Sequence, residues 1–321
     1  MCLFPKLIKN PKYKENKKNG GQLPPVSDSR ILGVPIKCGI CFECRKAIAR
    51  DWRIRLREEV TNNNEWKFIT LTFNTESLKD LNAETTKKTR YEKDNEIATI
   101  AIKRFLERHR KKYKTSIRHW CITELGNGKL EHLHIHGVLK TTLNDEELIK
   151  LWKYGYVHTS WNNQPNYVNG KTINYITKYM IKTDESHKYY TPKILCSPGI
   201  GKAFLNKEAA KIAKKNDYYI NNKGDKMPLP IYYRNNIYTE DERETLWINK
   251  LNEDKRYINK QEIKGKNKKD KLKNISAALR AAQKLNKEFG YASPDDGWEE
   301  KAYENSVREL IYKNRFKNGS E

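Results

Sequence analysis

The stretch Glu131-His132-Leu133-His134-Ile135-His136-Gly137-Val138-Leu139 decides the fold, because three histidines fall on alternate positions of an apolar run. In a β-strand successive side chains point to opposite faces, so the histidines are expected to share one face, while Leu133, Ile135 and Val138 tend toward the other. Neutral imidazole is a common metal ligand, and two on one strand can reach one divalent ion. The pattern predicts a metal site; the alternative is a solvated, histidine-rich strand face.

A second strand is expected to lie beside the histidines. Residues 117–124 and 130–140 both have strand character, and Asn127-Gly128 between them is a strong hairpin signal. Such a hairpin brings Glu124 next to the imidazoles. One carboxylate with two or three imidazoles is a ligand set for Mg²⁺ or Mn²⁺ that leaves positions open for a phosphate oxygen.

Other elements are expected on both sides of this hairpin. The β-branched and aromatic residues 66–73 predict a central strand, residues 74–93 a polar loop, and residues 95–113 a long amphipathic helix. Residues 45–60 predict another basic helix. The basic residues expected to contact a nucleic-acid backbone from these two helices are Arg50, Arg53, Arg57, Arg104 and Arg108.

The charge balance points to a polyanionic partner. The 321 residues hold 64 Lys and Arg against 40 Asp and Glu, a formal net charge of +24. Phosphate backbones are the usual partner of such a surplus, although a merely soluble basic protein is the alternative. No run approaches the ~18 apolar residues that span a bilayer, and the first residues form no signal-peptide pattern, so we expect a cytosolic protein without membrane contact.

Three of the six cysteines form the cluster Cys38-x-x-Cys41-x-x-Cys44. In a reducing compartment such clustering favours metal over disulfide. Three thiols are one short of a closed tetrahedral zinc site, and Cys2 is the only other candidate near the N-terminus. We therefore expect either a structural Zn²⁺ site made of these four cysteines or reduced thiols without a ligand.

A pair of tyrosines supplies a candidate nucleophile. Within residues 174–182, Tyr175 and Tyr179 lie four residues apart, so on a helix both hydroxyls emerge on one face, with Lys178 nearby. A cation near a phenol can lower its pKa and polarise a phosphate under attack. The alternative is an amphipathic helix with tyrosines at the edge of its core.

The chain divides into four predicted parts. Residues 1–65 hold an extended arm, the cysteine cluster and a basic helix; 66–190 the sheet with its histidines and tyrosines; 191–250 an extension; and 251–321 a Lys-rich arm over about 252–274 with helices near 275–289 and 299–316. Residues 199–203 lack the spacing and the Ser or Thr of a P-loop, so strand unwinding needs another protein.

The order of these motifs resembles that of the HUH rolling-circle replication initiators and, more narrowly, the replication initiator of gokushoviruses and related small single-stranded DNA microviruses. The broader resemblance rests on a Thr-x-Thr strand, a basic helix, a Glu strand, a His-apolar-His strand and a Tyr-x-x-Lys-Tyr helix in this order. The narrower one rests on Cys38-Gly39-x-Cys41-x-x-Cys44-Arg45, Trp52-Arg53-x-Arg55-x-x-Glu58, Glu124-Leu125-Gly126, Leu133-His134-Ile135-His136, Tyr175-Ile176-Thr177-Lys178-Tyr179, Pro198-Gly199-Ile200-Gly201 and Met227-Pro228-Leu229-Pro230.

The resemblance implies an α+β fold, in which an antiparallel, ferredoxin/RRM-like HUH endonuclease sheet is flanked by helices and followed by a helical basic C-terminal region. It implies that His134, His136 and Glu124 bind the metal, with His132 as an alternative ligand. It further implies origin nicking by a tyrosine that forms a 5′-phosphotyrosyl link, with Lys178 balancing charge, in the cytoplasm of a bacterial host whose helicase and polymerase are partners.

Two other functions remain possible from the residues alone. A hydrolytic metallonuclease would use water as the nucleophile and the tyrosines only for packing. A non-catalytic single-stranded nucleic-acid-binding protein would need only charge and aromatic side chains. The nick sequence, the host, the preferred metal, the first tyrosine to act and the oligomeric state are left open by the sequence.

Overall fold

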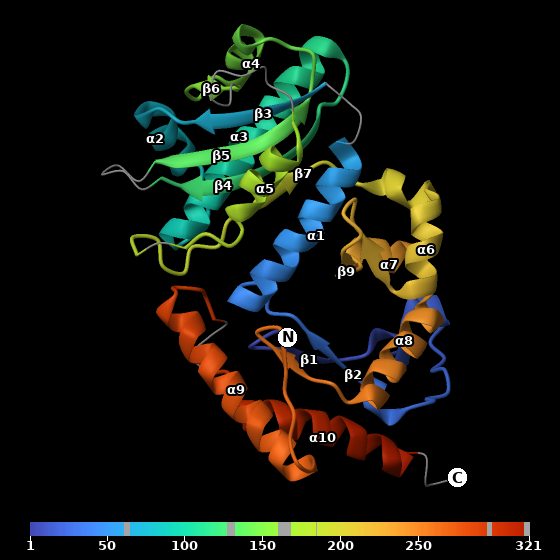
Figure 1. Cartoon of the computed structure of the whole chain (residues 1–321). Coiled ribbons are helices and arrows are strands. Elements are labelled where there is room, and N and C mark those ends of the chain that lie inside the picture. The colour runs from blue at the N-terminus through green and yellow to red at the C-terminus, as the bar shows by residue number, and fades with distance from the viewer. Residues whose placement is uncertain (61–64, 127–131, 160–167, 184, 294–296, 318–321) are drawn as a thin grey trace. The chain divides into compact units, whose positions relative to one another are not determined.

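Strand β5 (Leu133–Lys140), which carries two of the histidines, is the middle strand of a five-stranded sheet (Figure 1). The order is β6-β3-β5-β4-β7, and every neighbouring pair is antiparallel. The other strands are β3 (Trp66–Thr72), β4 (Arg118–Leu125), β6 (Val157–His158) and β7 (Ile194–Cys196). The protein is thus of the α+β class, with an antiparallel sheet flanked by helices, as expected; the finer ferredoxin-like arrangement stays a prediction.

The computed structural model describes residues 1–60, 65–126, 132–159, 168–183, 185–293 and 297–317. It divides into two compact units, one formed by residues 48–233 and the other by residues 1–47 together with 234–321. The predicted hairpin turn at Asn127-Gly128 lies outside the described residues. Among the described residues, no helix has the length and apolar character needed to cross a membrane.

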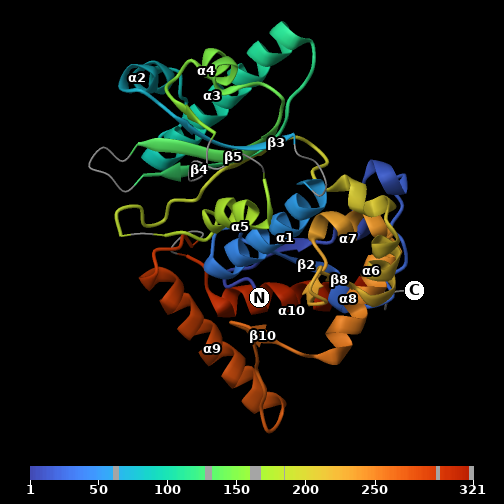
Figure 2. The same cartoon turned by 45° about the horizontal axis from the view of Figure 1, so that its top comes forward.

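Both faces of the sheet are covered by helices (Figure 2). Helix α3 (Arg90–Tyr113) packs through Ile97, Ala101 and Phe105 against the face that carries Ile135. On the opposite face, α5 (Gly170–Lys178) and the part of α1 (Phe42–Val60) from residue 48 onward pack against the aromatic side chains of β3 and β4. The histidines point to this second face, because His134 and His136 are an odd number of residues from Ile135.

One expectation about these faces is wrong. Val138 was expected opposite the histidines, but it packs with Trp120 on the histidine face, because it stands two residues after His136 and a strand repeats every two residues. Its predecessor Gly137 has no room for a side chain, since a Cβ atom there would lie 2.5 Å from the carbonyl oxygen of Trp120. An apolar residue on the histidine face is possible because α1 and α5 shield that face from water.

The segment expected to be a polar loop over residues 74–93 contains helix α2 (Thr75–Ala83). Asn74 caps it, because its side-chain oxygen accepts a hydrogen bond from the backbone N–H of Ser77. Leu81 is buried in the core beneath α3. The predicted helix that starts with a capping box at Asn144 is confirmed as α4 (Asp145–Trp152). The remaining elements of this unit are η4 (Lys202–Asn206), α6 (Glu208–Asn216), β8 (Tyr218–Ile220), β9 (Lys226–Pro228) and most of α7 (Ile231–Ile237).

The second unit joins the two ends of the chain. The first 35 residues were expected to form an extended arm, but β1 (Lys6–Lys9) pairs with β2 (Gly33–Ile36), and the buried Tyr13 donates a hydrogen bond of 2.9 Å to Glu244. These distant contacts, invisible in local composition, order the arm. The unit also contains η1 (Pro11–Tyr13), η2 (Lys17–Asn19), η3 (Ser29–Ile31), α8 (Glu240–Glu253), β10 (Tyr257–Ile258), β11 (Gln261–Glu262), α9 (Lys268–Glu288) and α10 (Glu300–Lys317). The two predicted tail helices are therefore confirmed, whereas the predicted flexible arm at 252–274 holds a short strand pair.

Candidate active site

A carboxylate and two imidazoles meet on the histidine face of the sheet. Glu124 of β4 stands directly opposite His134 of β5 in the strand register, and His136 is one step further along β5 on the same face. The nearest ligand atoms of these three residues all lie within 4.8 Å of one another. One oxygen and two nitrogens at this spacing fit a divalent cation that keeps further positions free for water or phosphate.

Hydrogen bonds fix the ring of His136 from two sides. Its Nδ1 lies 2.9 Å from Oγ1 of Thr70 on β3, and its Nε2 lies 2.6 Å from Oε2 of Glu124. Two lone pairs cannot face one another at this second distance, so a proton stands between Nε2 and the carboxylate. A cation bound by both residues would take the place of that proton, while Thr70 would keep the ring in position.

Glu124 is held in its charged form. Burial, which alone would raise its pKa, is outweighed by the hydrogen bonds from His136 and from Lys182, so the pKa of Glu124 lies below its ordinary value. Nζ of Lys182 lies 2.5 Å from Oε1 of the carboxylate. A buried carboxylate that already attracts one ammonium group is an anionic anchor of the kind that a metal ion needs.

His134 is disposed to stay neutral. Burial first, and then the neighbouring His136, lower its pKa from the ordinary 6.5. A neutral imidazole has the lone pair that a metal requires. Gly126 packs against this ring, since a Cβ atom at residue 126 would stand 3.0 Å from Cε1 of His134. The glycine after β4 therefore sets the room in which the ring of His134 can turn.

The two tyrosines lie over the same cluster. Tyr175 is on α5, and Tyr179 follows the last residue of this helix. The ring of Tyr179 stacks on that of His136, with centroids 4.4 Å apart and planes inclined by 4°, and its hydroxyl donates a hydrogen bond to the hydroxyl of Tyr175. Tyr179 is buried, and this burial raises its pKa above the ordinary value, whereas Tyr175 is partly exposed.

The lysine expected to act at this site differs from the one that contacts the carboxylate. Nζ of Lys178 lies 4.2 Å from the ring centroid of Tyr175, and its side chain is exposed. Lys182, which was not singled out from the sequence, forms the ion pair with Glu124. Its backbone N–H donates to the carbonyl of Lys178, so the chain makes one more turn beyond α5. A lysine three residues after Tyr179 was the signal that could have identified it.

The remaining histidines stand apart from this group. His132 precedes β5, and its buried Nδ1 has no hydrogen-bond partner among the described residues. His158 is exposed on β6, beside Thr70 in the strand register. Neither belongs to the ligand group of Glu124, His134 and His136.

The five arginines expected to contact DNA fall on two sides of the sheet. On α1, Arg53 and Arg57 approach α5, with hydrogen bonds to Thr177 and Asn174, and Arg50 pairs with Asp51. On α3, which covers the other face, Arg104 pairs with Glu84, and Arg108 donates to the carbonyl oxygens at the end of α4. Arg53 and Arg57 therefore lie nearest the tyrosines.

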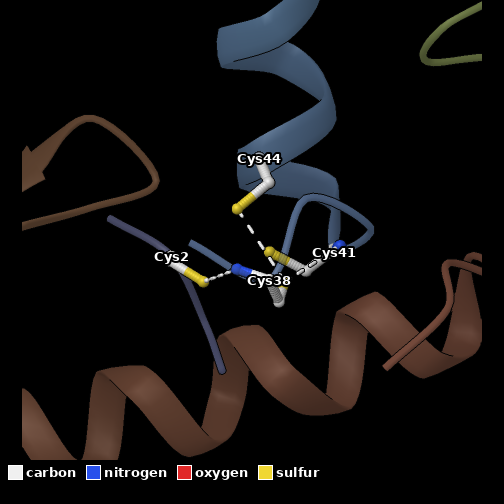
Figure 3. Close-up of side chains that lie close together, drawn as sticks. All are labelled: Cys2, Cys38, Cys41 and Cys44. Atoms are coloured by element: carbon white, nitrogen blue, oxygen red, sulfur yellow. Dashed lines mark hydrogen bonds between the residues drawn. The ribbon is translucent and has the colours of Figure 1, made fainter. Parts of the chain in front are cut away.

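The four cysteines Cys2, Cys38, Cys41 and Cys44 also come together, in the other unit of the chain (Figure 3). Their Sγ atoms lie within 4.8 Å of one another. The structure thus holds two separate groups of side chains that could bind a metal, one with nitrogen and oxygen atoms and one with sulfur atoms only.

Comparison with known proteins identifies the class to which the sheet points. Residues 66–184 match the model of a family described as replication-associated protein ORF2. The match extends from β3 to just beyond Lys182, so it contains the candidate ligands and both tyrosines, and it excludes the cysteine cluster. It supports a rolling-circle replication initiator that acts on DNA. No curated protein and no solved structure was found to match the chain.

Proposed function

We propose that the protein is an HUH-type replication initiator, of the kind found in gokushovirus-like microviruses, which nicks and rejoins single-stranded DNA at a rolling-circle origin. The observation that carries this proposal is the stacking of Tyr179 on His136, 4.4 Å away, inside a group that also contains Glu124 and His134. A phenol that touches a candidate metal ligand is where a phosphate bound by the metal would meet its nucleophile.

The reaction exchanges one phosphate ester for another. The oxygen of a tyrosine attacks the scissile phosphorus and loses its proton, the bond from phosphorus to the 3′-oxygen breaks, and the 3′-oxygen leaves as a hydroxyl group. The 5′ end stays on the protein as a phosphotyrosyl ester, so a later 3′-hydroxyl can reverse the step and close a circle. Mg²⁺ or Mn²⁺ held by Glu124, His134 and His136 would polarise the phosphate.

The two tyrosines have different surroundings, which suits a division of labour. Tyr175 is partly exposed and accepts a hydrogen bond from the buried Tyr179. We expect Tyr175 to reach an incoming phosphate first and Tyr179 to act in the second transfer. The ammonium group of Lys178, exposed above the Tyr175 ring, is available to balance the charge of the phosphate.

The strand to be cut needs a basic path to these tyrosines. Arg53 and Arg57 contact α5 and supply positive charge beside it. Arginine pairs with phosphate through two parallel hydrogen bonds, and backbone contacts of this kind make binding dependent on salt. We infer that the protein acts in the cytoplasm of a bacterial host, together with a host helicase and a host polymerase, since residues 199–203 lack the P-loop pattern.

A covalent adduct tests the proposal. The full chain is incubated with Mn²⁺ and a 3′-labelled pool of random single-stranded oligonucleotides, and the label is followed on a denaturing gel. We expect a protease-sensitive protein–DNA adduct that the Tyr175→Phe/Tyr179→Phe double variant no longer forms. Tyr189→Phe, which changes an exposed tyrosine elsewhere, is the control and should form adduct at the parental rate.

The alternatives give other products. Free 5′-phosphate ends without an adduct would identify a hydrolytic metallonuclease, in which water attacks. If the His134→Ala/His136→Ala variant retains every activity of the parent, the histidines are not part of a reaction centre, and the protein is a nucleic-acid binder. Nicking by the double tyrosine variant at the parental rate would contradict the assignment of the nucleophile.

A further inference from the structure

The four clustered cysteines carry an inference separate from the nicking reaction. They reach one place from different parts of the chain: Cys2 from the N-terminal residues, Cys38 and Cys41 from the turn before α1, and Cys44 from the first turn of that helix (Figure 3). All four are free thiols. Since thiols do not attract one another strongly, such a convergence calls for a ligand or for simple apolar packing.

The spacing of the sulfur atoms agrees with a tetrahedral metal site. Sγ of Cys38 lies 3.8 Å from Sγ of Cys44, and the four Sγ atoms all lie within 4.8 Å of one another. A zinc ion with four sulfur ligands at ~2.3 Å requires sulfur atoms about 3.8 Å apart. The cluster therefore has the size of a zinc-tetrathiolate site without rearrangement of the backbone.

The backbone is arranged to stabilise thiolates. The N–H of Cys38 donates to Sγ of Cys2 at 3.2 Å, and the N–H of Cys41 donates to Sγ of Cys38 at 3.4 Å. The tight turn between Cys38 and Cys41 needs Gly39, whose φ is +82° although nothing lies within 4 Å of the position of a Cβ atom. Hydrogen bonds from N–H groups favour the ionised sulfur that binds a metal.

The cluster also joins the two ends of the chain. It packs with Leu3 and Phe4 on one side and with Leu279 of α9 on the other. Gln283 of α9 donates to the carbonyl of Leu3, and Asn286 of α9 accepts from the N–H of Phe42 at the start of α1. A single ion at the cluster would fasten the N-terminal residues and the start of α1 at the place where both meet α9.

We propose that Cys2, Cys38, Cys41 and Cys44 bind one structural Zn²⁺ ion that holds together the unit formed by residues 1–47 and 234–321. Four protein ligands leave no position for a substrate, which is the arrangement of a structural site and not of a catalytic one. The site lies outside residues 66–184, which match the replication-associated family, so it is independent of the nicking centre.

Metal analysis of the full-length chain tests the proposal. We expect about one zinc ion per chain in protein made in zinc-replete medium, and a loss of that zinc in Cys41→Ser. The matched control is Cys196→Ser, which removes a thiol on β7 outside the cluster and should keep the zinc. Zinc-free parent protein, or equal zinc in Cys41→Ser and the parent, would overturn the proposal.

A spectrum of the parent keeps the proposal testable even if Cys41→Ser fails to fold. Protein made with Co²⁺ in place of zinc should show the intense near-ultraviolet charge-transfer absorption of cobalt–thiolate bonds and the visible bands of tetrahedral cobalt. Cobalt that binds without the thiolate band would occupy another site, such as the histidine group, and would overturn the proposal. Removal of zinc by a chelator should speed hydrogen exchange in α9 and not in α5.

Discussion

The ion pair between Lys182 and Glu124 leads to a prediction with a definite sign. In Lys182→Met the stem of the side chain is kept while its charge is removed. A cation that binds Glu124 must then no longer compete with, or approach, an ammonium group 2.5 Å from the same carboxylate. We therefore expect the variant to bind Mn²⁺ more tightly than the parent, although it loses a favourable contact.

The magnitude follows from the exposure of the pair. A hydrogen bond to a charged group contributes about 1.5–3 kcal/mol. The side chain of Lys182 is 33% exposed and that of Glu124 13%, so solvent screening reduces the contribution to about 1 kcal/mol. That free energy corresponds to about fivefold tighter metal binding. The metal-free variant should be less stable toward unfolding by about the same amount.

Calorimetric titration of the metal-free full chain with Mn²⁺ measures the effect, and urea unfolding measures the stability. Lys178→Met is the matched control, because Lys178 loses the same charge but contacts the ring of Tyr175 and, in the described part of the chain, no carboxylate. Its dissociation constant should change less than that of Lys182→Met. Unchanged or weaker Mn²⁺ binding in Lys182→Met would refute the reasoning, because the lysine would then be positioning the carboxylate for the metal.

Three further predictions concern the same face of the sheet. Gly126→Ala should weaken Mn²⁺ binding about tenfold by displacing the ring of His134, whereas Gly170→Ala, with nothing within 4 Å of its Cβ position, should not; equal titrations of the two would contradict this. Because burial lowers the pKa of His134 from 6.5, the unfolded chain binds more protons below that pH, so the unfolding free energy of the metal-free protein should decrease as the pH falls below about 6.5. Urea unfolding at pH 5 and pH 7 checks this, and a decrease of the same size in His134→Gln would count against it. Arg57→Gln should lower the salt dependence of single-stranded DNA binding by about 0.7 in the log–log slope, while Arg104→Gln, on the other face, should leave it unchanged; binding isotherms at several salt concentrations compare them.

Part of this site could be read from the sequence because it is local. The alternation of residues 131–139 specifies which side chains share a face, and a short connection between two strands makes them antiparallel neighbours. Glu124 was therefore expected beside the histidines, and the register has it opposite His134. The helical spacing of Tyr175 and Tyr179 is equally local.

Other features depended on contacts between residues far apart in the chain. The composition of the first 35 residues predicts an arm, but burial of Tyr13 and pairing of β1 with β2 order it. The basic helices looked equivalent in the sequence, yet they cover opposite faces of the sheet. No local pattern reveals which face a helix will cover, because that choice is made by the packing of whole elements.

The sequence by itself determined the strand that carries the imidazoles, its acidic neighbour, the helical pair of phenols and the Cys-x-x-Cys-x-x-Cys turn, since each of these depends on residues within one element or one hairpin. Only the tertiary structure decided that α5 covers the histidine face, that Lys182 and not Lys178 reaches the carboxylate, and that Cys2 joins three cysteines 36 or more residues away. The physical reason is that these contacts form only when the apolar faces of separate elements are buried against one another, and the chain fixes that arrangement as a whole.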